Sequence, residues 1–143
     1  MEYKRIEDKI VFRLEMGEGL MESVQKIAAS ENVKLASISG IGACSKIEMG
    51  YIDLSIKDYV FKIFEGNMEI LQATGNITLK DGEPFPHIHI SVANEECKAF
   101  GGHLNEATIS ATFEGVMTIM DHEINREFNE DLGLALMNVC GKK

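Results

Sequence analysis

The segments Pro84-Phe85-Pro86-His87-Ile88-His89-Ile90-Ser91 and Phe100-Gly101-Gly102-His103-Leu104 hold three of the four histidines in this chain of 143 residues. In the first segment polar and apolar residues alternate, which is the period of a β-strand with one buried face. His87 and His89 are therefore expected to point from the same face. His103 follows two glycines, where the backbone can turn tightly or approach another group closely. Three imidazoles brought together in this way predict a divalent-metal site.

Similar alternation recurs on both sides of these segments and predicts further strands. We expect them at residues 9–14, 34–39, 46–54, 58–64, 68–79, 98–100 and 109–120. Leu20, Val24 and Ile27 recur at helical spacing and predict one clear helix, while residues 132–139 suit a strand or a short helix. Residues 40–43 and 65–67 are expected to form turns. Together these patterns predict one α+β domain over residues 1–143, with a largely antiparallel sheet of about seven strands.

The composition is that of an acidic globular protein. The net charge is −9, and the 14 lysines and arginines are scattered along the chain, which disfavours general binding to nucleic acid. The three cysteines form no C-x-x-C pair and the first residues are charged, so we expect reduced thiols and a cytoplasmic location. No apolar run approaches the roughly 20 residues of a membrane span, so we expect no membrane insertion.

The three histidines have the chemistry of a metal-ligand set. Neutral imidazole binds zinc and related divalent ions, and three such ligands leave a fourth position open for water or a small molecule. We therefore expect a divalent metal, zinc first, at His87, His89 and His103. Each ligand also needs an outer hydrogen-bond partner that fixes its tautomer. We assign that role to Glu114, which shares the polar row of its strand with Thr112 and which a neighbouring antiparallel strand would bring near the histidine face.

Other interpretations of these and nearby residues remain open. The histidines could make ordinary hydrogen bonds at a subunit interface without a metal. Tyr59 is expected either to pack in the core or to form a pocket wall, and His122 is expected on the surface. Glu83 is a weaker candidate for the outer partner, and Cys97 has no second cysteine beside it. Residues 40–43 lack the G-x-G-x-x-G and Lys-Ser/Thr patterns, so a phosphate loop there is disfavoured.

A series of short motifs runs through nearly the whole chain. It comprises Arg13-Leu14 with Gly17-Glu18, Ala36-Ser37-Ile38-Ser39-Gly40-Ile41-Gly42-Ala43, Gly50-Tyr51-Ile52-Asp53, Tyr59, Met68-Glu69-Ile70-Leu71 with Gly75-Asn76, His87-Ile88-His89, Gly101-Gly102-His103-Leu104 and Thr112-Phe113-Glu114. In this order and at this spacing the set resembles the PPC domain, conserved in plants and prokaryotes, in its stand-alone prokaryotic form. The resemblance implies an antiparallel sheet with flanking helices, and a homotrimer.

The resemblance also implies a link to DNA. Stand-alone proteins of this family commonly carry a DNA-binding label, which comes mainly from plant relatives in which an AT-hook precedes the domain. An AT-hook needs an Arg-Gly-Arg-Pro core to enter the minor groove. This sequence has no such core, so no DNA-binding residue can be identified. The plant domains generally lack the three histidines, so a metal role would belong to the prokaryotic branch.

Three hypotheses of function follow from these observations. The first is a trimeric metal-binding domain that senses or binds a small molecule. The second is a DNA-binding or transcription-associated regulatory protein, as the family label suggests. The third is a metal-dependent enzyme that acts on a small polar substrate, with Glu114 as the candidate general base.

Overall fold

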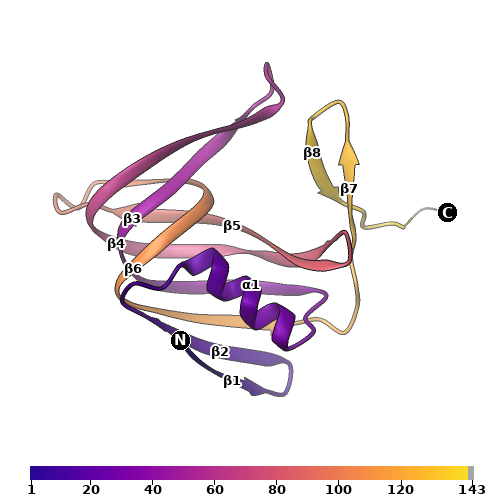
Figure 1. Ribbon diagram of the computed structural model, residues 1–143, viewed down its shortest axis with the longest axis horizontal. Coiled ribbons are helices and arrows are strands. Elements are labelled where there is room, and N and C mark those ends of the chain that lie inside the picture. The colour runs from indigo at the N-terminus through magenta and orange to yellow at the C-terminus, as the bar shows by residue number, and fades with distance from the viewer. Residues whose placement is uncertain (142–143) are drawn as a thin grey trace.

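A six-stranded antiparallel sheet forms most of the molecule in the computed structural model, which describes residues 1–141. The elements are β1 (Glu2–Ile6), β2 (Lys9–Glu15), α1 (Leu20–Ser30), β3 (Ala36–Asp53), β4 (Asp58–Lys80), β5 (Glu83–Ala93), β6 (Ala99–Ile119), β7 (Arg126–Asn129) and β8 (Leu134–Met137). The strand order is β1-β2-β6-β3-β4-β5 (Figure 1). Because β6 also pairs with β5, strands β6, β3, β4 and β5 form a closed circuit. β7 and β8 form a separate two-stranded sheet.

The predicted antiparallel architecture is confirmed, since every pairing between these strands is antiparallel. The family resemblance implied flanking helices, and this expectation is wrong, because α1 is the single helix within residues 1–141. No helix in this range is long and apolar enough to cross a membrane. β1 was not predicted, because its residues are all exposed and it is held by backbone pairing with β2.

Three long strands replace six of the short strands that were predicted. β3 joins residues 34–39 to 46–54, β4 joins 58–64 to 68–79, and β6 joins 98–100 to 109–120. The turns predicted at 40–43 and 65–67 are therefore wrong, and β3 shows register shifts between Gly40 and Gly42 instead. A β-carbon at Gly40 would overlap the Phe113 ring of β6. The glycines thus allow β6 to approach β3 closely rather than turning the chain.

Helix α1 lies across one face of the sheet and completes the core (Figure 1). Leu20, Val24 and Ile27 are fully buried, at the helical spacing that the sequence predicts. They belong to one apolar cluster with sheet residues that include Leu14 and Phe113. Burying a side chain of this kind stabilises the fold by roughly 1.5–3 kcal/mol.

The N-terminus of α1 is held by a carboxylate from the sheet. Gly19 precedes the helix and provides no side-chain cap. Glu106 of β6 instead accepts the N–H groups of Met21 at 2.8 Å and of Glu22 at 3.2 Å through its two oxygens. A negative charge at this end of a helix is favoured by the helix dipole. The contact fixes α1 to β6, the strand that also carries His103.

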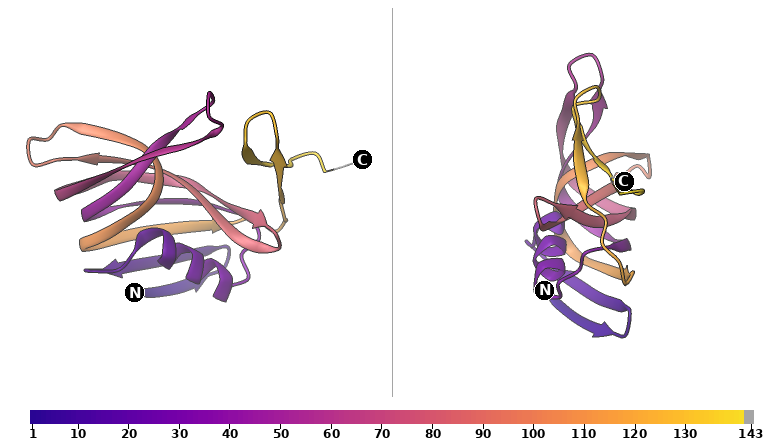
Figure 2. Two further views of the ribbon diagram at one scale, coloured as in Figure 1. Left: turned by 45° about the horizontal axis from the view of Figure 1, so that its top comes forward. Right: turned by 90° about the vertical axis from the view of Figure 1, so that its right-hand side faces the viewer.

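The β7–β8 hairpin lies apart from the large sheet and beside the tip of the β3–β4 hairpin (Figures 1 and 2). It is attached near both of its ends. The Leu79 N–H donates to the carbonyl oxygen of Ile124 at 2.8 Å, and Lys57 Nζ donates to the carbonyl oxygen of Glu130 at 2.9 Å. The tail for which the sequence allowed strand or helix is therefore a strand, and it forms a wall beside β4.

Candidate metal centre

The three predicted histidines come together where β5 meets β6. His89 lies directly opposite His103 in the pairing of these strands, and His87 lies two residues along β5 on the same face. One ring nitrogen from each histidine lies within 4.8 Å of the others. The ring centroids are 5.3 Å apart for His87 and His89, 5.0 Å for His87 and His103, and 5.5 Å for His89 and His103. The predicted cluster is therefore present in the fold.

The two glycines before His103 act through close approach rather than a turn. β6 continues as a strand through Gly101 and Gly102. A β-carbon at Gly102 would lie 2.6 Å from the carbonyl oxygen of Gly50, and one at Gly101 would overlap the carbonyl oxygen of Ile90. The absence of side chains lets β6 pack between β3 and β5, which brings His103 to the other two histidines.

The histidine cluster offers buried nitrogens that have no hydrogen-bond partner in the part of the chain that the structure describes. His87 and His103 are partly buried and His89 is exposed. The Nε2 atom of His87 and the Nδ1 atom of His103 are buried without a hydrogen bond. Buried polar atoms in native proteins nearly always have a partner, so these two nitrogens are suited to receive one from a bound group. A metal ion bonded to these nitrogens would supply that partner.

Burial also keeps two of the rings uncharged. Loss of hydration, followed by repulsion from Arg126 and His89, lowers the pKa of His87 from 6.5 to about 4. Loss of hydration and the charges of His87, His89 and Arg126 lower the pKa of His103 to about 4 as well. Neutral imidazole is the form that binds a metal, so both rings are ready to act as ligands at neutral pH.

The spacing fits a single tetrahedral ion after small side-chain rotations. Zinc–nitrogen bonds of about 2.0–2.1 Å in tetrahedral geometry place the ligand nitrogens about 3.4 Å apart. The present separation of up to 4.8 Å exceeds this only modestly. Residues 1–141 offer no other cluster of three metal-binding groups of this kind. The donor set of three imidazoles suits zinc and neighbouring transition metals rather than calcium or magnesium.

Tyr59 of β4 forms an aromatic wall against the histidines. Its ring stacks on His103 with centroids 4.2 Å apart, and Phe61 stacks on Tyr59 at 5.5 Å. Burial raises the pKa of the Tyr59 phenol, so the group stays protonated. Tyr59 therefore lines the pocket, which was one of the two roles expected for it, and it restrains the orientation of the His103 ring.

Arg126 is a site residue that sequence analysis missed. It is the first residue of β7, and its guanidinium donates to Thr78 Oγ1 at 2.8 Å, to Asn76 Oδ1 at 2.9 Å and to the carbonyl oxygen of Ala135 at 2.9 Å. Its Nη2 atom lies 3.4 Å from Nδ1 of His87. An isolated arginine in a polar segment carries no local signal of these contacts, because every partner outside the hairpin is about forty residues or more distant.

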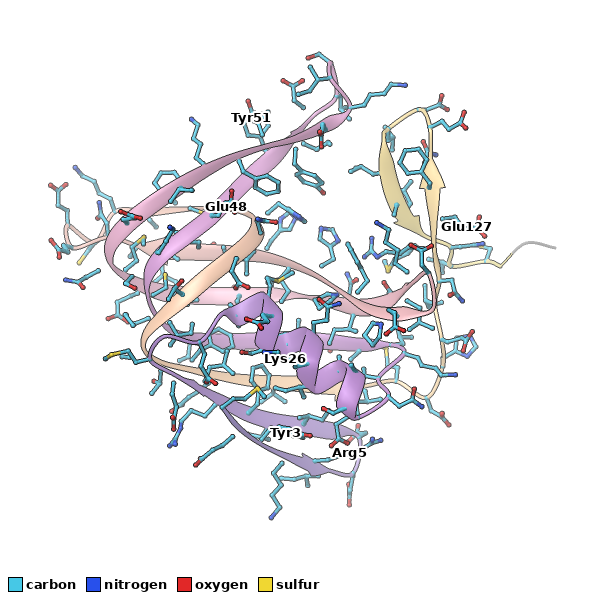
Figure 3. All side chains as sticks on the ribbon, viewed as in Figure 1. Tyr3, Arg5, Lys26, Glu48, Tyr51 and Glu127 are labelled. Carbon is cyan, nitrogen blue, oxygen red and sulfur yellow. The ribbon has the colours of Figure 1, made fainter. Side chains whose placement is uncertain are left out.

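A cavity of about 250 Å³ opens beside the histidines. His87, His103 and Tyr59 line one side, and residues of the β7–β8 hairpin, including Phe128, line the other. Figure 3 shows Tyr51, on β3, and Glu127, on β7, at the two sides of this region, with ring side chains gathered between them. No aspartate or glutamate in the described part of the chain lines this cavity.

The structure does not bring the predicted outer partners to the histidines. Glu114 lies on β6 opposite Arg13 and Ile41, and it lines a different groove on the sheet. It is eleven residues from His103 on the same strand, which corresponds to about 37 Å along an extended chain. Thr112 is also exposed at that end of β6. The assignment assumed that pairing of antiparallel strands would bring Glu114 near the histidine face, and the length of β6 prevents it.

The remaining candidates also lie away from the cluster. Glu83 is exposed at the start of β5. His122 is exposed, as expected, and lines a separate surface depression near Glu123. Cys97 is an exposed free thiol in the turn before β6. None of the three is in position to complete the histidine site.

The family model described as the Plants and Prokaryotes Conserved (PCC) domain matches residues 1–122. The chain belongs to the PCC domain family. The match contains all three clustered histidines and ends before Arg126 and the β7–β8 hairpin. No curated protein matches this chain in sequence.

Three solved structures share this fold over nearly the whole chain. A protein from Pyrococcus horikoshii, described as a plant- and prokaryote-conserved protein, is 33% identical, with coverage of 95% of this chain and 92% of its own and a TM-score of 0.84. A metal-containing protein from Archaeoglobus fulgidus is 32% identical, with coverage of 95% and 96% and a TM-score of 0.84. A protein from Bacteroides thetaiotaomicron, provisionally described as DNA-binding, is 28% identical, with coverage of 96% of both chains and a TM-score of 0.92.

Proposed function

We propose that this PCC domain protein binds one divalent metal ion, zinc first, through His87, His89 and His103, and accepts a small ligand in the adjoining cavity. The observation that carries the proposal is the pair of buried ring nitrogens without partners, within a cluster of three imidazoles. The relative from Archaeoglobus fulgidus, described as metal-containing, supports it. When bound by three histidines, such an ion supplies a Lewis acid with an open coordination position.

The residues of the chain itself prepare this site. Burial keeps His87 and His103 neutral, and the stacked ring of Tyr59 restrains His103. Residues of the β7–β8 hairpin line the cavity beside them. A pre-oriented ligand set loses less side-chain entropy when the metal binds, which raises affinity.

The metal content of natively purified protein tests the proposal, together with titration of the metal-free protein with zinc against a coloured chelator. We expect one equivalent of metal, and we expect His87→Ala and His103→Ala to lower zinc affinity by at least about 100-fold, since each removes a direct ligand. His122→Ala is the matched control, because His122 is exposed and outside the cluster. Equal zinc affinity in the wild type and in His87→Ala would contradict the proposal.

We further propose that the protein assembles as a cytoplasmic homotrimer. The family resemblance supports the trimer, and so does an apolar groove of about 690 Å³ to which the exposed side chains of Val11, Ile41 and Val116 contribute. The unpaired state of Cys44, Cys97 and Cys140 supports the location. Light scattering at several protein concentrations tests the assembly, and a mass of a single chain throughout would contradict it.

DNA binding is the second candidate function. It is favoured by the provisional description of the relative from Bacteroides thetaiotaomicron. The charge distribution opposes it, because seven of the 14 basic residues form ion pairs with carboxylates: Arg5, Lys9, Arg13, Lys26, Lys34, Lys46 and Lys98. A mobility assay at low salt decides between the two, since phosphate contacts give affinity that falls steeply with salt. Tight, salt-dependent binding by the wild type would favour the DNA hypothesis.

The enzyme hypothesis lacks the general base that was expected for it. Glu114 was the candidate, and it lines a groove other than the one beside the histidines. The metal site with its cavity is therefore proposed here as a binding site. A substrate would have to be identified before turnover could be assayed.

A further inference from the structure

The cavity beside the histidines carries two cations in a protein that is otherwise acidic. Lys80 and Arg126 both line it, and no acidic side chain does within residues 1–141. Their charged groups lie over the same aromatic ring, with Lys80 Nζ at 5.3 Å and Arg126 Cζ at 5.1 Å from the centroid of Phe85. The chain has a net charge of −9, so this concentration of positive charge is a local feature that favours an anion.

Arg126 is partly buried and has no carboxylate partner within residues 1–141. Its three hydrogen bonds, to Thr78, Asn76 and the carbonyl oxygen of Ala135, are all to neutral acceptors, and its Nη2 atom also lies 3.4 Å from Nδ1 of His87. No ion pair between Arg126 and a carboxylate occurs among the residues that the structure describes, whereas seven other basic side chains have one. Removing a cation from water is costly unless an anion compensates it. A bound anion would provide that compensation.

The guanidinium is also held in a fixed position. Three of its nitrogen atoms donate to separate acceptors at 2.8–2.9 Å, which sets the plane of the group. A guanidinium has five N–H donors. Three of them make these contacts and a fourth can face Nδ1 of His87, so at least one N–H remains available to a ligand. A pre-oriented arginine is better suited to bind a carboxylate than a mobile lysine at the surface.

The size and lining of the cavity restrict the ligand further. A volume of about 250 Å³ lies just below the range of roughly 300–1,000 Å³ that is typical of small-molecule pockets. Phe85, Phe128 and Leu134 give the cavity an apolar part. The space therefore suits a short organic chain with one charged end.

We propose that Arg126, assisted by Lys80, binds the carboxylate of a small organic acid whose apolar part occupies the cavity beside His87 and His103. The proposal rests on the proposed function, because it names the ligand class of the same site. The carboxylate accepts a hydrogen bond from Arg126, and the apolar chain packs against Phe85 and Phe128. The acid is thereby held next to the histidine cluster.

Titration of metal-free protein with sodium butyrate, followed by NMR, tests the proposal, because the contact to Arg126 needs no metal. We expect Arg126→Gln to weaken butyrate binding about tenfold, since it removes a charge-assisted hydrogen bond. Lys80→Gln should weaken it about threefold, and it is informative even if Arg126→Gln loosens the hairpin, because Lys80 has no hydrogen bond to the hairpin. Arg13→Gln is the matched control, since Arg13 is exposed and pairs with Glu2 and Glu15.

Two further titrations separate this proposal from the proposed function. Sodium phosphate replaces butyrate in the first, and zinc is titrated against a chelator in the second. Binding of phosphate but not butyrate, or equal butyrate affinity in the wild type, Arg126→Gln and Lys80→Gln, would overturn the carboxylate proposal. Zinc binding without butyrate binding also overturns it and leaves the metal site standing. Butyrate binding that depends on Arg126, without zinc binding, supports it and refutes the metal site.

Discussion

The buried histidines should make the metal-free protein sensitive to mild acid. Burial lowers the pKa of His87 and of His103 from 6.5 to about 4, so between these pH values the unfolded chain binds more protons than the folded one. The contribution of these two rings to the free energy of unfolding is therefore fully present above pH 6.5, and it is lost as the pH drops toward 4. Each histidine contributes a slope of up to about 1.4 kcal/mol per pH unit. Both rings are partly exposed to water, so we expect a total loss of about 3 kcal/mol for the pair.

Urea unfolding followed by circular dichroism, with EDTA present, measures this loss between neutral pH and pH 4. Other groups also titrate in this range, so the quantity of interest is the difference between the wild type and the double variant His87→Gln, His103→Gln. We expect the wild type to lose about 3 kcal/mol more than the double variant. His122→Gln should lose as much as the wild type, because His122 is exposed. Parallel curves for the wild type and the double variant would refute the argument that burial holds these rings neutral.

Three further predictions concern the fold and the metal. Gly75→Ala should lower the free energy of unfolding by about 3 kcal/mol in urea titrations, because a β-carbon there would overlap the carbonyl oxygen of His87. Glu106→Gln should cost about 1 kcal/mol, since it removes the charge at the N-terminus of α1, and equal stability to the wild type would count against that capping role. Zinc at about 100 times its dissociation constant should raise the free energy of unfolding by about 2.7 kcal/mol in the wild type, and scanning calorimetry should detect no such rise in His103→Ala.

The sequence was sufficient to predict the histidine cluster because its signals are local. Alternation along β5 placed His87 and His89 on one face, and the paired glycines before His103 indicated either a tight turn or a close approach of chains, of which the structure has the second. Alternation also predicted the antiparallel sheet, and helical spacing predicted α1. Each of these inferences needs only neighbours within one strand or one turn of helix.

The failures arose where the decisive contact is distant along the chain. Gly40 was interpreted as part of a turn, whereas its missing side chain makes room for Phe113, more than seventy residues later. Glu114 was expected near the histidines through antiparallel pairing, although it shares the 21-residue strand β6 with His103 and is separated from it along that strand. Arg126 reaches the site only because Leu79 and Lys57 hold the β7–β8 hairpin in place. No local pattern records such contacts.

X-ray absorption spectroscopy at the zinc edge, on protein loaded with one equivalent of zinc, tests the central claim most directly. The account predicts three imidazole nitrogens at about 2.0–2.1 Å with one further light-atom ligand. It also predicts that the imidazole signal falls by one ligand in His89→Ala and stays unchanged in His122→Ala. A spectrum with oxygen ligands alone, with sulfur ligands, or with the same imidazole count in both variants would contradict the assignment of the metal to His87, His89 and His103.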